Sequence, residues 1–409
     1  MKRLLGVALG IMTAIGGFVD IGDLVTNALV GSRFGLSLAW ATLVGLVGIC
    51  LYAEMSGRVA AVTGRGTFDL VRERLGPRAG LANLIASFLV TALTFTAEIG
   101  GIALSLELAT SVNYLLWVPM VGVAVWLIIW RVKFSLLENV FGTLGLALLV
   151  FGVALWQLHP HWGDLVHQIA VPHKPKTEGT PVYFYYAIAL FGAAMTPYEV
   201  FFFSSGGVEE KWTKKDIITA RTNVFIGFPL GGMLSLAIAA VATLVLLPNN
   251  ISVNTLGQVG LPVAVAGGKL ALAVAILGFV AATFGAALET GLSCGYSAAQ
   301  YFGWQWGKFV RPRRAARFHL LVLLTLILAV GGVLTTINPI TVTEYSVVFS
   351  AVALPLTYFP ILVIANDSDY MGDKSNGRIT NFLGSIFLVI IVIASVAAIP
   401  LMFWTKAGQ

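Results

Sequence analysis

Long runs of apolar residues with few charged side chains constrain this chain more than any other feature of its sequence. A helix needs about 20 apolar residues to cross the hydrocarbon core of a bilayer. Charged residues make up only 11% of the 409 residues, against roughly 25% in soluble proteins. The sequence therefore predicts one all-α polytopic membrane domain, residues 1–409, with eleven transmembrane helices. The runs are 4–31, 36–57, 80–107, 112–130, 135–157, 182–204, 222–247, 263–300, 318–337, 342–365 and 380–403.

The eighth run, 263–300, is too long for one straight crossing, so we expect it to bend or to project from the membrane. Loop charges predict the orientation of all the runs. With a cytoplasmic N-terminus, twenty of the 25 Lys and Arg residues fall in cytoplasmic segments, four (Arg33, Lys174, Lys176 and Lys406) lie on the other side, and Lys269 lies near a membrane edge. We therefore expect a multi-pass protein of the plasma (inner) membrane with an extracellular or periplasmic C-terminus. The net charge of +6 follows from this bias and does not indicate nucleic-acid binding.

Two carboxylates, Asp20 and Asp23, interrupt the first apolar run. A charge at mid-membrane depth costs several kcal/mol, and a helix would place both side chains on one face. Gly16, Gly17 and Gly22 make it easier for the backbone to leave helical geometry, which exposes carbonyl groups. Carboxylate and carbonyl oxygens together suit a hard divalent cation. The alternatives are a buried acidic pair that holds helices together, or one Asp that is kept protonated.

A second interruption is predicted in the sixth run, where Pro197 removes a backbone donor and Glu199 adds another acid. A proline kink alone is common in membrane helices. Breaks in the first and sixth helices, however, are what a five-plus-five inverted repeat predicts, with the substrate site between them at the midplane. The two repeats would be residues 4–157 and 182–365, and the run 380–403 would lie outside them.

Further acids lie in other runs. Glu98, in the third run, could carry protons, form a second cation site or pair with a neighbouring helix. Four acids near the ends or faces of runs are interpreted as structural: Glu54, Glu138, Glu289 and Glu344. The chain has no His-Glu-x-x-His motif, no phosphate-binding loop with its Lys and no Cys-x-x-Cys. We therefore expect a protein that is not an enzyme and needs no cofactor.

Six short segments occur in an order and spacing that resemble one transporter family. They are Asp20-Ile21-Gly22-Asp23; Glu54 to Val59 with Thr63 to Gly66; Ala97 to Gly100; Met195-Thr196-Pro197-Tyr198; Leu354-Pro355; and Asp369 to Gly372 followed by Asn376. The family is NRAMP, the divalent-metal transporters, which have Asp-Pro-Gly-Asn at the first segment and Met-Pro-His at the fourth. The resemblance implies an amino-acid-transporter (LeuT-like) fold, with helices 1 and 6 broken, an eleventh helix and alternating access.

The same resemblance implies a set of metal ligands. Aligning Pro197 places Thr196 at the family's metal-binding Met and Tyr198 at its His. The ion would be bound by the side chains of Asp20, Asp23 and Thr196 and by the carbonyl groups of Gly17 and Ala193, with Gly22 and Pro197 at the helix breaks.

The departures from the family pattern bear on metal selectivity. The site loses a soft thioether and gains the Asp23 carboxylate, a set that suits magnesium, calcium or manganese. This pattern resembles the NRAMP-related magnesium transporters. Met195 could still face the ion if the break rotates it, which keeps manganese or iron open. Because Tyr198 replaces the His, we expect transport without proton coupling, although Glu98 and Glu199 could carry protons.

The sequence thus predicts a secondary transporter or facilitator that imports Mg²⁺, tolerates Mn²⁺ and has the metal ion and the lipid bilayer as partners. The alternative is a proton-coupled Mn²⁺ or Fe²⁺ transporter of the NRAMP type. An organic-cation or amino-acid transporter on the same fold is disfavoured by the acidic pair. A membrane-embedded hydrolase or a metal sensor is disfavoured because no nucleophile and base pair is visible. The sequence leaves the oligomeric state open.

Overall fold

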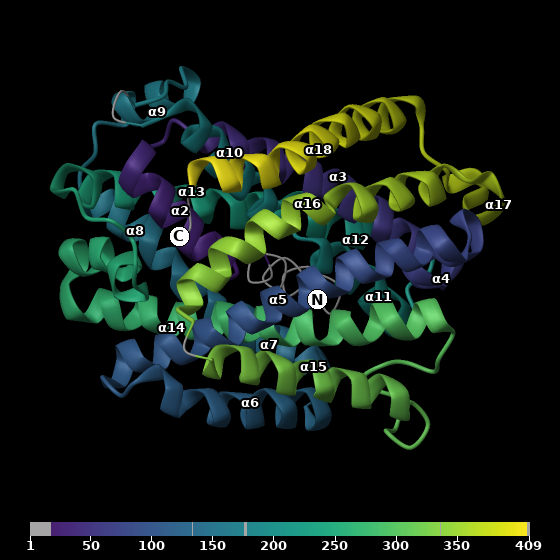
Figure 1. Ribbon diagram of the computed structural model, residues 1–409. Coiled ribbons are helices and arrows are strands. Elements are labelled where there is room, and N and C mark those ends of the chain that lie inside the picture. The colour runs from purple at the N-terminus through teal and green to yellow at the C-terminus, as the bar shows by residue number, and fades with distance from the viewer. Residues whose placement is uncertain (1–17, 133, 176–177, 336, 407–409) are drawn as a thin grey trace.

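The computed structural model describes residues 18–132, 134–175, 178–335 and 337–406, which form helices joined by loops, with no strand in these ranges (Figure 1). Side chains of residues 134–139, which include Glu138, are outside the described part. The uninterrupted long helices are α3 (Ala39–Thr63), α5 (Pro77–Thr110), α6 (Tyr114–Arg131), α13 (Phe228–Val245), α15 (Ala316–Leu334), α16 (Pro339–Asn366) and α18 (Arg378–Thr405).

The remaining helices are shorter or interrupted. They are α2 (Ile21–Phe34), α4 (Thr67–Leu75), α7 (Phe134–Gly145) with α8 (Val150–Gln157), α9 (Trp162–Ala170), α10 (Thr180–Ala194), α11 (Pro197–Glu209), α12 (Ile217–Thr222), α14 (Leu256–Phe302) and α17 (Ser368–Met371). Ten segments of the described residues are long and apolar enough to cross a membrane. The predicted all-α membrane fold is confirmed. The count of eleven stays a prediction, because the first run lies partly outside the described residues.

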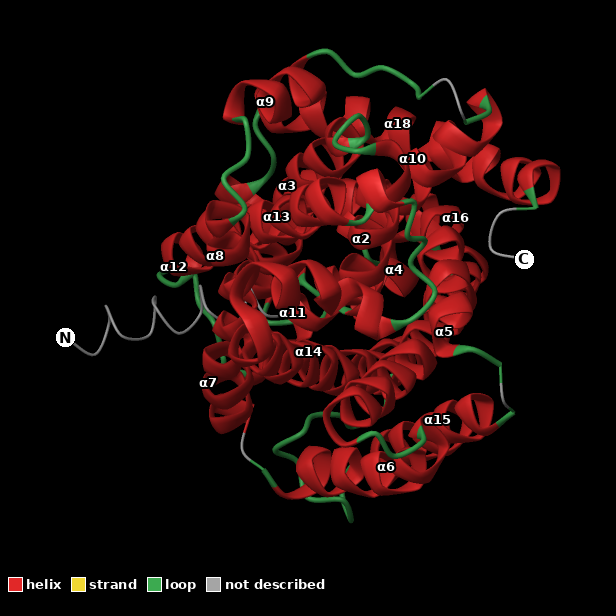
Figure 2. Cartoon of the chain, turned by 90° about the vertical axis from the view of Figure 1, so that its left-hand side faces the viewer, coloured by secondary structure: helices red, strands yellow, loops and turns green. Residues whose placement is uncertain are grey.

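The outer helices carry large apolar side chains on their exposed faces. α6 and α15 lie side by side at one edge of the molecule, and α18 lies at the opposite edge (Figures 1 and 2). Phe382, Val389 and Ile393 of α18 are exposed, as are Leu116 and Val123 of α6. Exposed apolar surface of this extent suits contact with lipid tails, which are as apolar as these side chains.

α14 is the long eighth run, and it bends as its length requires. The bend lies at Gly268, whose φ is +66° and ψ −159°. A residue with a side chain would be strained at this positive φ, because its Cβ would crowd the backbone.

The first predicted break lies at Val19 and Asp20, and α2 begins at Ile21. Asp20 is the N-cap of α2, with extended backbone, and its Oδ1 accepts a hydrogen bond from the Asp23 N–H over 2.9 Å. The prediction that Gly22 forms the break is wrong, because Gly22 lies in the first turn of α2. Its lack of a side chain serves packing instead, since a Cβ there would lie 2.8 Å from Val347 Cγ1.

The second predicted break, between α10 and α11, is confirmed. Met195 (φ −123°, ψ 48°) and Thr196 (φ −63°, ψ 130°) are both outside helical geometry. Pro197 is the first residue of α11, a position where its missing N–H costs no hydrogen bond. The extended conformation of Thr196 is the one that a following proline favours.

At the predicted cytoplasmic end, Glu54 of α3 makes the structural contacts expected for it. Its carboxylate pairs with Arg58 (Nε–Oε1 3.0 Å). It also pairs with Arg221, in the last turn of α12 (Nε–Oε1 2.7 Å). Arg58 also donates to Asn376 Oδ1 over 2.6 Å, and the side chains of Glu54 and Arg58 are only 6% and 4% exposed. The network ties α3 to α12 and to the loop after α17.

A second contact at the same end holds α4 in place. Arg65 Nη2 lies 2.7 Å from Glu73 Oε2, and the Tyr370 hydroxyl donates to Glu73 Oε1 over 3.0 Å. Two hydrogen bonds lower the pKa of the Glu73 carboxyl. The one from Arg65 has the larger effect and the one from Tyr370 the smaller. Because both partners are well exposed, this contact orients α4 rather than adding much stability.

We predict that Glu54→Gln lowers the unfolding free energy by about 3 kcal/mol, because it leaves the buried Arg58 guanidinium without its carboxylate. Thermal unfolding in detergent measures the change. Asp373→Asn is the control, since Asp373 also pairs with two cations but is exposed. Equal midpoints for the two variants would contradict a structural role for the buried network.

Candidate metal centre

The two helix breaks meet at the centre of the molecule. Val347 of α16 lies between them, because a Cβ at Gly22 would be 2.8 Å from its Cγ1 and a Cβ at Gly192 would be 2.3 Å from its carbonyl oxygen. The Tyr198 hydroxyl of α11 donates to Asp20 Oδ2 over 3.2 Å, which links the second break directly to the first. The structure thus brings together segments almost 180 residues apart in the sequence.

Asp20 and Asp23 are both buried, 2% and 1% exposed. The Asn27 side chain donates to Asp23 Oδ1 over 2.9 Å and also to the Asp23 carbonyl oxygen over 2.9 Å. Asp23 Oδ2 makes no hydrogen bond of normal geometry among the described residues, and the Ser235 hydroxyl, which also makes none, lies beside the same carboxylate. Buried carboxylate oxygens normally have partners, so this atom is available to a ligand.

Glu98 of α5 reaches the same break from another side. Its Oε1 accepts a hydrogen bond from the Ile21 N–H over 3.2 Å, and it is fully buried. Glu98 therefore caps one of the free N–H groups at the start of α2. Its Oε2 has no hydrogen-bond partner in the described part of the chain.

At the second break, the Thr196 hydroxyl donates to Glu199 Oε2 over 3.3 Å. Glu199 is buried and interacts electrostatically with both Asp20 and Asp23, so α11 contributes to the same acidic cluster. Ala193 lies in the last turn of α10, where carbonyl groups have no partner within the helix. Gly17 is outside the described residues.

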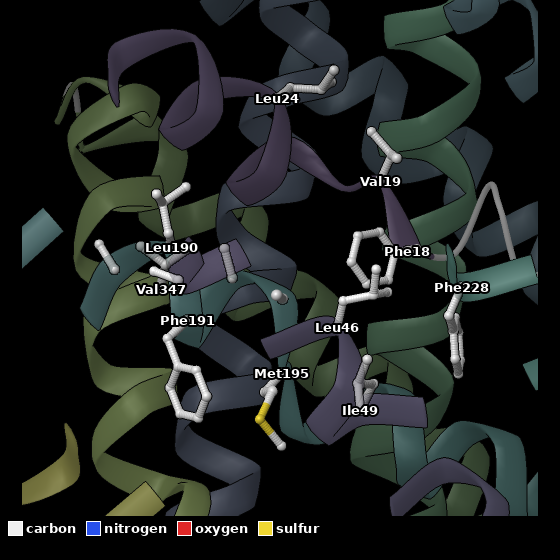
Figure 3. Close-up of a cluster of buried hydrophobic side chains, with 14 of the residues drawn as sticks. Phe18, Val19, Leu24, Leu46, Ile49, Leu190, Phe191, Met195, Phe228 and Val347 are labelled. Carbon is white, nitrogen blue, oxygen red and sulfur yellow. The ribbon is translucent and has the colours of Figure 1, made fainter. Parts of the chain in front are cut away.

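Met195 is directed elsewhere. Its sulfur packs against α3, where a Cβ at Gly48 would lie 2.7 Å away from it. The Tyr358 hydroxyl donates to the Met195 carbonyl oxygen over 3.3 Å. Figure 3 shows the Met195 sulfur pointing away from Leu24 of α2 and toward the side where Ile49 lies. The residue is fully buried in this apolar environment.

Glu289 of α14 lies on the face of that helix that packs against α11, although its sequence position suggested a structural residue. The Ser293 hydroxyl donates to the Tyr198 carbonyl oxygen over 3.3 Å, which places this face of α14 against α11. Glu289 lies one turn before Ser293 and interacts electrostatically with Asp20. The spacing of Glu289, Ser293, Ser297 and Gln300 along one helix face was the signal that could have revealed it.

None of the ion pairs among the described residues involves these five acids: Asp20, Asp23, Glu98, Glu199 and Glu289. No group of three or more His, Cys, Asp or Glu side chains in the described ranges is arranged so that it could hold a metal ion by itself. Asp20 and Asp23 are therefore considered as candidate ligands together with carbonyl and hydroxyl oxygens.

Two interrupted helices that meet beside buried acids in an all-helical membrane protein define the LeuT-like fold class. A family model described as "Natural resistance-associated macrophage protein-like" (Nramp) matches residues 10–400. The chain is a member of this family, which confirms the resemblance seen in the sequence.

Individual proteins agree with this assignment. The chain is 24% identical over 394 residues to the divalent metal cation transporter MntH of Aeromonas hydrophila, covering 92% of this chain and 91% of that one. It is also 24% identical to MntH of Levilactobacillus brevis over 403 residues, covering 95% and 87%. These curated relatives are bacterial, full-length matches.

Solved structures share the fold. That of a manganese transporter from Eremococcus coleocola, in complex with an aromatic bis-isothiourea substituted compound, has a TM-score of 0.73 at 17% identity and covers 99% of this chain and 94% of that one. Mhp1, a nucleobase-cation-symport-1 family transporter in a closed conformation, has a TM-score of 0.62 at 14% identity and covers 97% and 92%.

We predict that Asp20→Asn and Asp23→Asn each reduce metal uptake by about 100-fold or more, since ligand-supporting groups alone are worth 10–100-fold. The fold should persist, because Asn is as good an N-cap as Asp at position 20. Uptake into proteoliposomes is measured alongside thermal unfolding. Asp164→Asn, an acid in the first turn of the exposed helix α9, is the control. Near-normal uptake by both variants would exclude this stretch as the site.

Proposed function

We propose that this protein is a secondary transporter that imports divalent metal ions, with Mn²⁺ as its substrate, by alternating access. The observation that carries the proposal is the Tyr198–Asp20 hydrogen bond, which joins two helix breaks beside buried acids without ion-pair partners. The names of the relatives support it, because they are divalent metal cation transporters and manganese transporters.

The proposed ligands are the Asp20 and Asp23 carboxylates, the Thr196 hydroxyl and the Ala193 carbonyl group, together with the Gly17 carbonyl group outside the described residues. Carbonyl groups at the C-terminal end of α10 carry the negative end of a helix dipole, which favours a cation. The unpartnered Asp23 Oδ2 offers a direct ligand atom. Water would complete the coordination of an ion with this few protein ligands.

Membrane location follows from the family, and the finer topology is part of the proposal. We infer a plasma-membrane protein with a cytoplasmic N-terminus, on the bias of Lys and Arg toward one side. With that orientation, the inside-negative potential favours uptake of a divalent ion by roughly 4–5 kcal/mol per 100 mV.

Mg²⁺ is the second candidate substrate. The comparisons give no support to the predicted Mg²⁺ preference, and the manganese alternative is closer to them. One observation keeps Mg²⁺ in view: the Met195 thioether packs against α3, while a carboxylate oxygen of Asp20 bonds to Tyr198 beside the break. A site of oxygen ligands alone suits Mg²⁺ and Mn²⁺ better than softer metals.

Competition for uptake distinguishes the two metals. Proteoliposomes take up Mn²⁺ under a clamped inside-negative potential, in the presence of Mg²⁺, Ca²⁺ or Fe²⁺ at increasing concentration. The proposal expects Mn²⁺ uptake that micromolar Mg²⁺ does not inhibit. Inhibition by Mg²⁺ at the same concentration as by unlabelled Mn²⁺ would make Mg²⁺ a full substrate. Absence of uptake for every divalent ion would overturn the transport proposal.

We predict that Asp23→Asn combined with Thr196→Met shifts preference further from Mg²⁺ toward Mn²⁺ by about tenfold, or about 1.4 kcal/mol. The double change replaces a carboxylate by an amide and adds a thioether, which gives a softer and less negative site. The ratio of Mn²⁺ to Mg²⁺ uptake is measured against each single variant. An unchanged ratio would place selectivity elsewhere, for example in Met195 or in the width of the site.

Proton coupling is tested separately. We predict that metal uptake does not acidify the vesicle lumen, because Tyr198 is a phenol that does not titrate near neutral pH and two carboxylates already balance a divalent ion. A pH-sensitive dye trapped in the vesicles reports lumen pH at a clamped potential. Metal-dependent acidification that disappears in Glu98→Gln or Glu199→Gln would instead establish a proton-coupled transporter.

A further inference from the structure

The loop between α14 and α15, residues 303–315, lies at the predicted cytoplasmic end of the molecule (Figure 1). It carries an arginine cluster that continues into the first turn of α15. The four members are exposed: Arg311, Arg313, Arg314 and Arg317. No Asp or Glu occurs between Gly303 and Leu320. None of the ion pairs in the described ranges involves these four side chains, so the loop is a positive surface without an acid in its own segment.

Other cations at this end are already paired with acids. Arg65 lies 2.7 Å from a carboxylate oxygen of Glu73, and Lys214 and Lys374 lie 3.3 Å and 2.9 Å from the carboxylate of Asp373. The bias of Lys and Arg toward the cytoplasm explains why both groups of cations are at this end. It does not explain why the arginine cluster has no acids. Guanidinium groups present a planar fork of donors that matches phosphate oxygens, which makes phosphate a suitable ligand.

The backbone of the loop presents the cluster from a defined turn. The N–H groups of Arg314 and Ala315 both donate to the Arg311 carbonyl oxygen, over 2.8 Å and 3.2 Å. A ring nitrogen of His319 lies 3.0 Å from the Val310 carbonyl oxygen, which ties the loop to α15. The arginines are therefore held close together in space as well as in sequence.

The cluster adjoins a lipid-facing stripe of α15. Arg317 is followed at helical spacing by Leu320, Leu324, Ile327 and Leu328, which are 55%, 47%, 56% and 73% exposed. Residues at these intervals share one face of a helix, so the charged end and the apolar stripe form one continuous surface. A phospholipid has the same order of chemistry, with a phosphate at the membrane surface and acyl chains beneath it.

Aromatic side chains lie beside the arginine that begins the stripe. The Arg317 guanidinium lies over the Trp304 ring, 5.6 Å from its centroid, and Phe302 stacks on Trp304 with the centroids 5.0 Å apart. Phe302 and Phe309 are 49% and 57% exposed. Tryptophan is enriched at membrane–water interfaces, so these rings indicate that the cluster lies at headgroup depth. Together with the stripe, they favour a lipid, which offers an anion and an apolar chain in one molecule.

The same loop is bonded to α11. The Lys308 N–H donates to Glu209 Oε1 over 2.6 Å, and the Tyr296 hydroxyl of α14 donates to the same oxygen over 2.8 Å. Glu209 is the last residue of α11, and α11 begins at the second helix break. A ligand that holds this loop therefore holds the far end of the helix whose Tyr198 contacts Asp20.

We propose that Arg311, Arg313, Arg314 and Arg317 bind the phosphate headgroup of an anionic phospholipid, whose acyl chains lie along the exposed stripe of α15. Each basic residue near an anionic membrane surface strengthens the association, and four act together here. The proposal concerns a lipid partner and goes beyond metal transport, since it does not depend on which ion the protein carries.

The first test counts lipids bound to the purified full-length protein in detergent by native mass spectrometry. The probes are dioleoyl phosphatidylglycerol and, as the uncharged comparison, dioleoyl phosphatidylcholine. We expect the anionic lipid to bind about tenfold more tightly, and the combined change Arg311→Gln, Arg313→Gln and Arg314→Gln to remove this preference. The matched control is Arg65→Gln, Lys214→Gln and Lys374→Gln, which removes the same charge at the same end from cations that already have acids.

The second test separates a lipid from other anions. Inorganic phosphate and a short single-stranded DNA oligonucleotide are each added to the protein with bound phosphatidylglycerol, at the concentration of the lipid. The proposal expects neither to displace the lipid, because neither offers acyl chains to α15. Displacement by phosphate would indicate a site for a soluble anion, and displacement by the oligonucleotide would indicate a nucleic-acid surface. Either result would overturn the lipid proposal.

Three further outcomes decide the proposal. Equal binding of the two lipids by the unchanged protein would overturn it, as would an equal loss of preference in the control variant, which would reduce the effect to net charge. If the triple change in the cluster fails to fold, Arg317→Gln decides. This single change should lower the affinity for phosphatidylglycerol about fivefold, and an unchanged affinity would count against the site. Because the readout is lipid binding, a failure of metal uptake would leave this inference standing.

Discussion

The hydrogen bond from the Tyr198 hydroxyl to Asp20 Oδ2 joins the two interrupted helices, and the centre of the protein is arranged around it. Acids at membrane depth are costly unless they find partners, and here three of them are only partly satisfied. Glu98 caps the Ile21 N–H, and Asp20 caps Asp23, yet each of Asp23, Glu98 and Glu199 keeps one oxygen without a hydrogen-bond partner among the described residues. These unpartnered carboxylate oxygens are the basis of the proposed cation site.

Close backbone approach makes this arrangement possible. Val347 can lie against α2 and α10, beside the two breaks, because Gly22 and Gly192 have no side chains. Adding a methyl group at either position would push α16 away from α2 or α10, since packed interiors have little free volume. The small residues therefore set the distance between the breaks, and the acids act within that fixed geometry.

The two ends of the molecule differ in how they are held. At the predicted cytoplasmic end, Glu54, Arg58 and Arg221 form a buried ionic network across α3 and α12. At the other end, cavities lie between α2, α10 and α16 and approach the break.

The sequence by itself determined the all-α membrane fold, the bend in the eighth run, the interruption at Pro197 and the family, because hydrophobic run length, proline chemistry and motif order are local properties. It also located Asp20 and Asp23, since charges in an apolar run stand out. Only the tertiary structure decided the break at Val19 and Asp20 rather than Gly22, and the packing of Met195 against α3. The contacts of Tyr198 with Asp20 and with Ser293 depend on helices distant in sequence, and no single-sequence pattern encodes which helices meet.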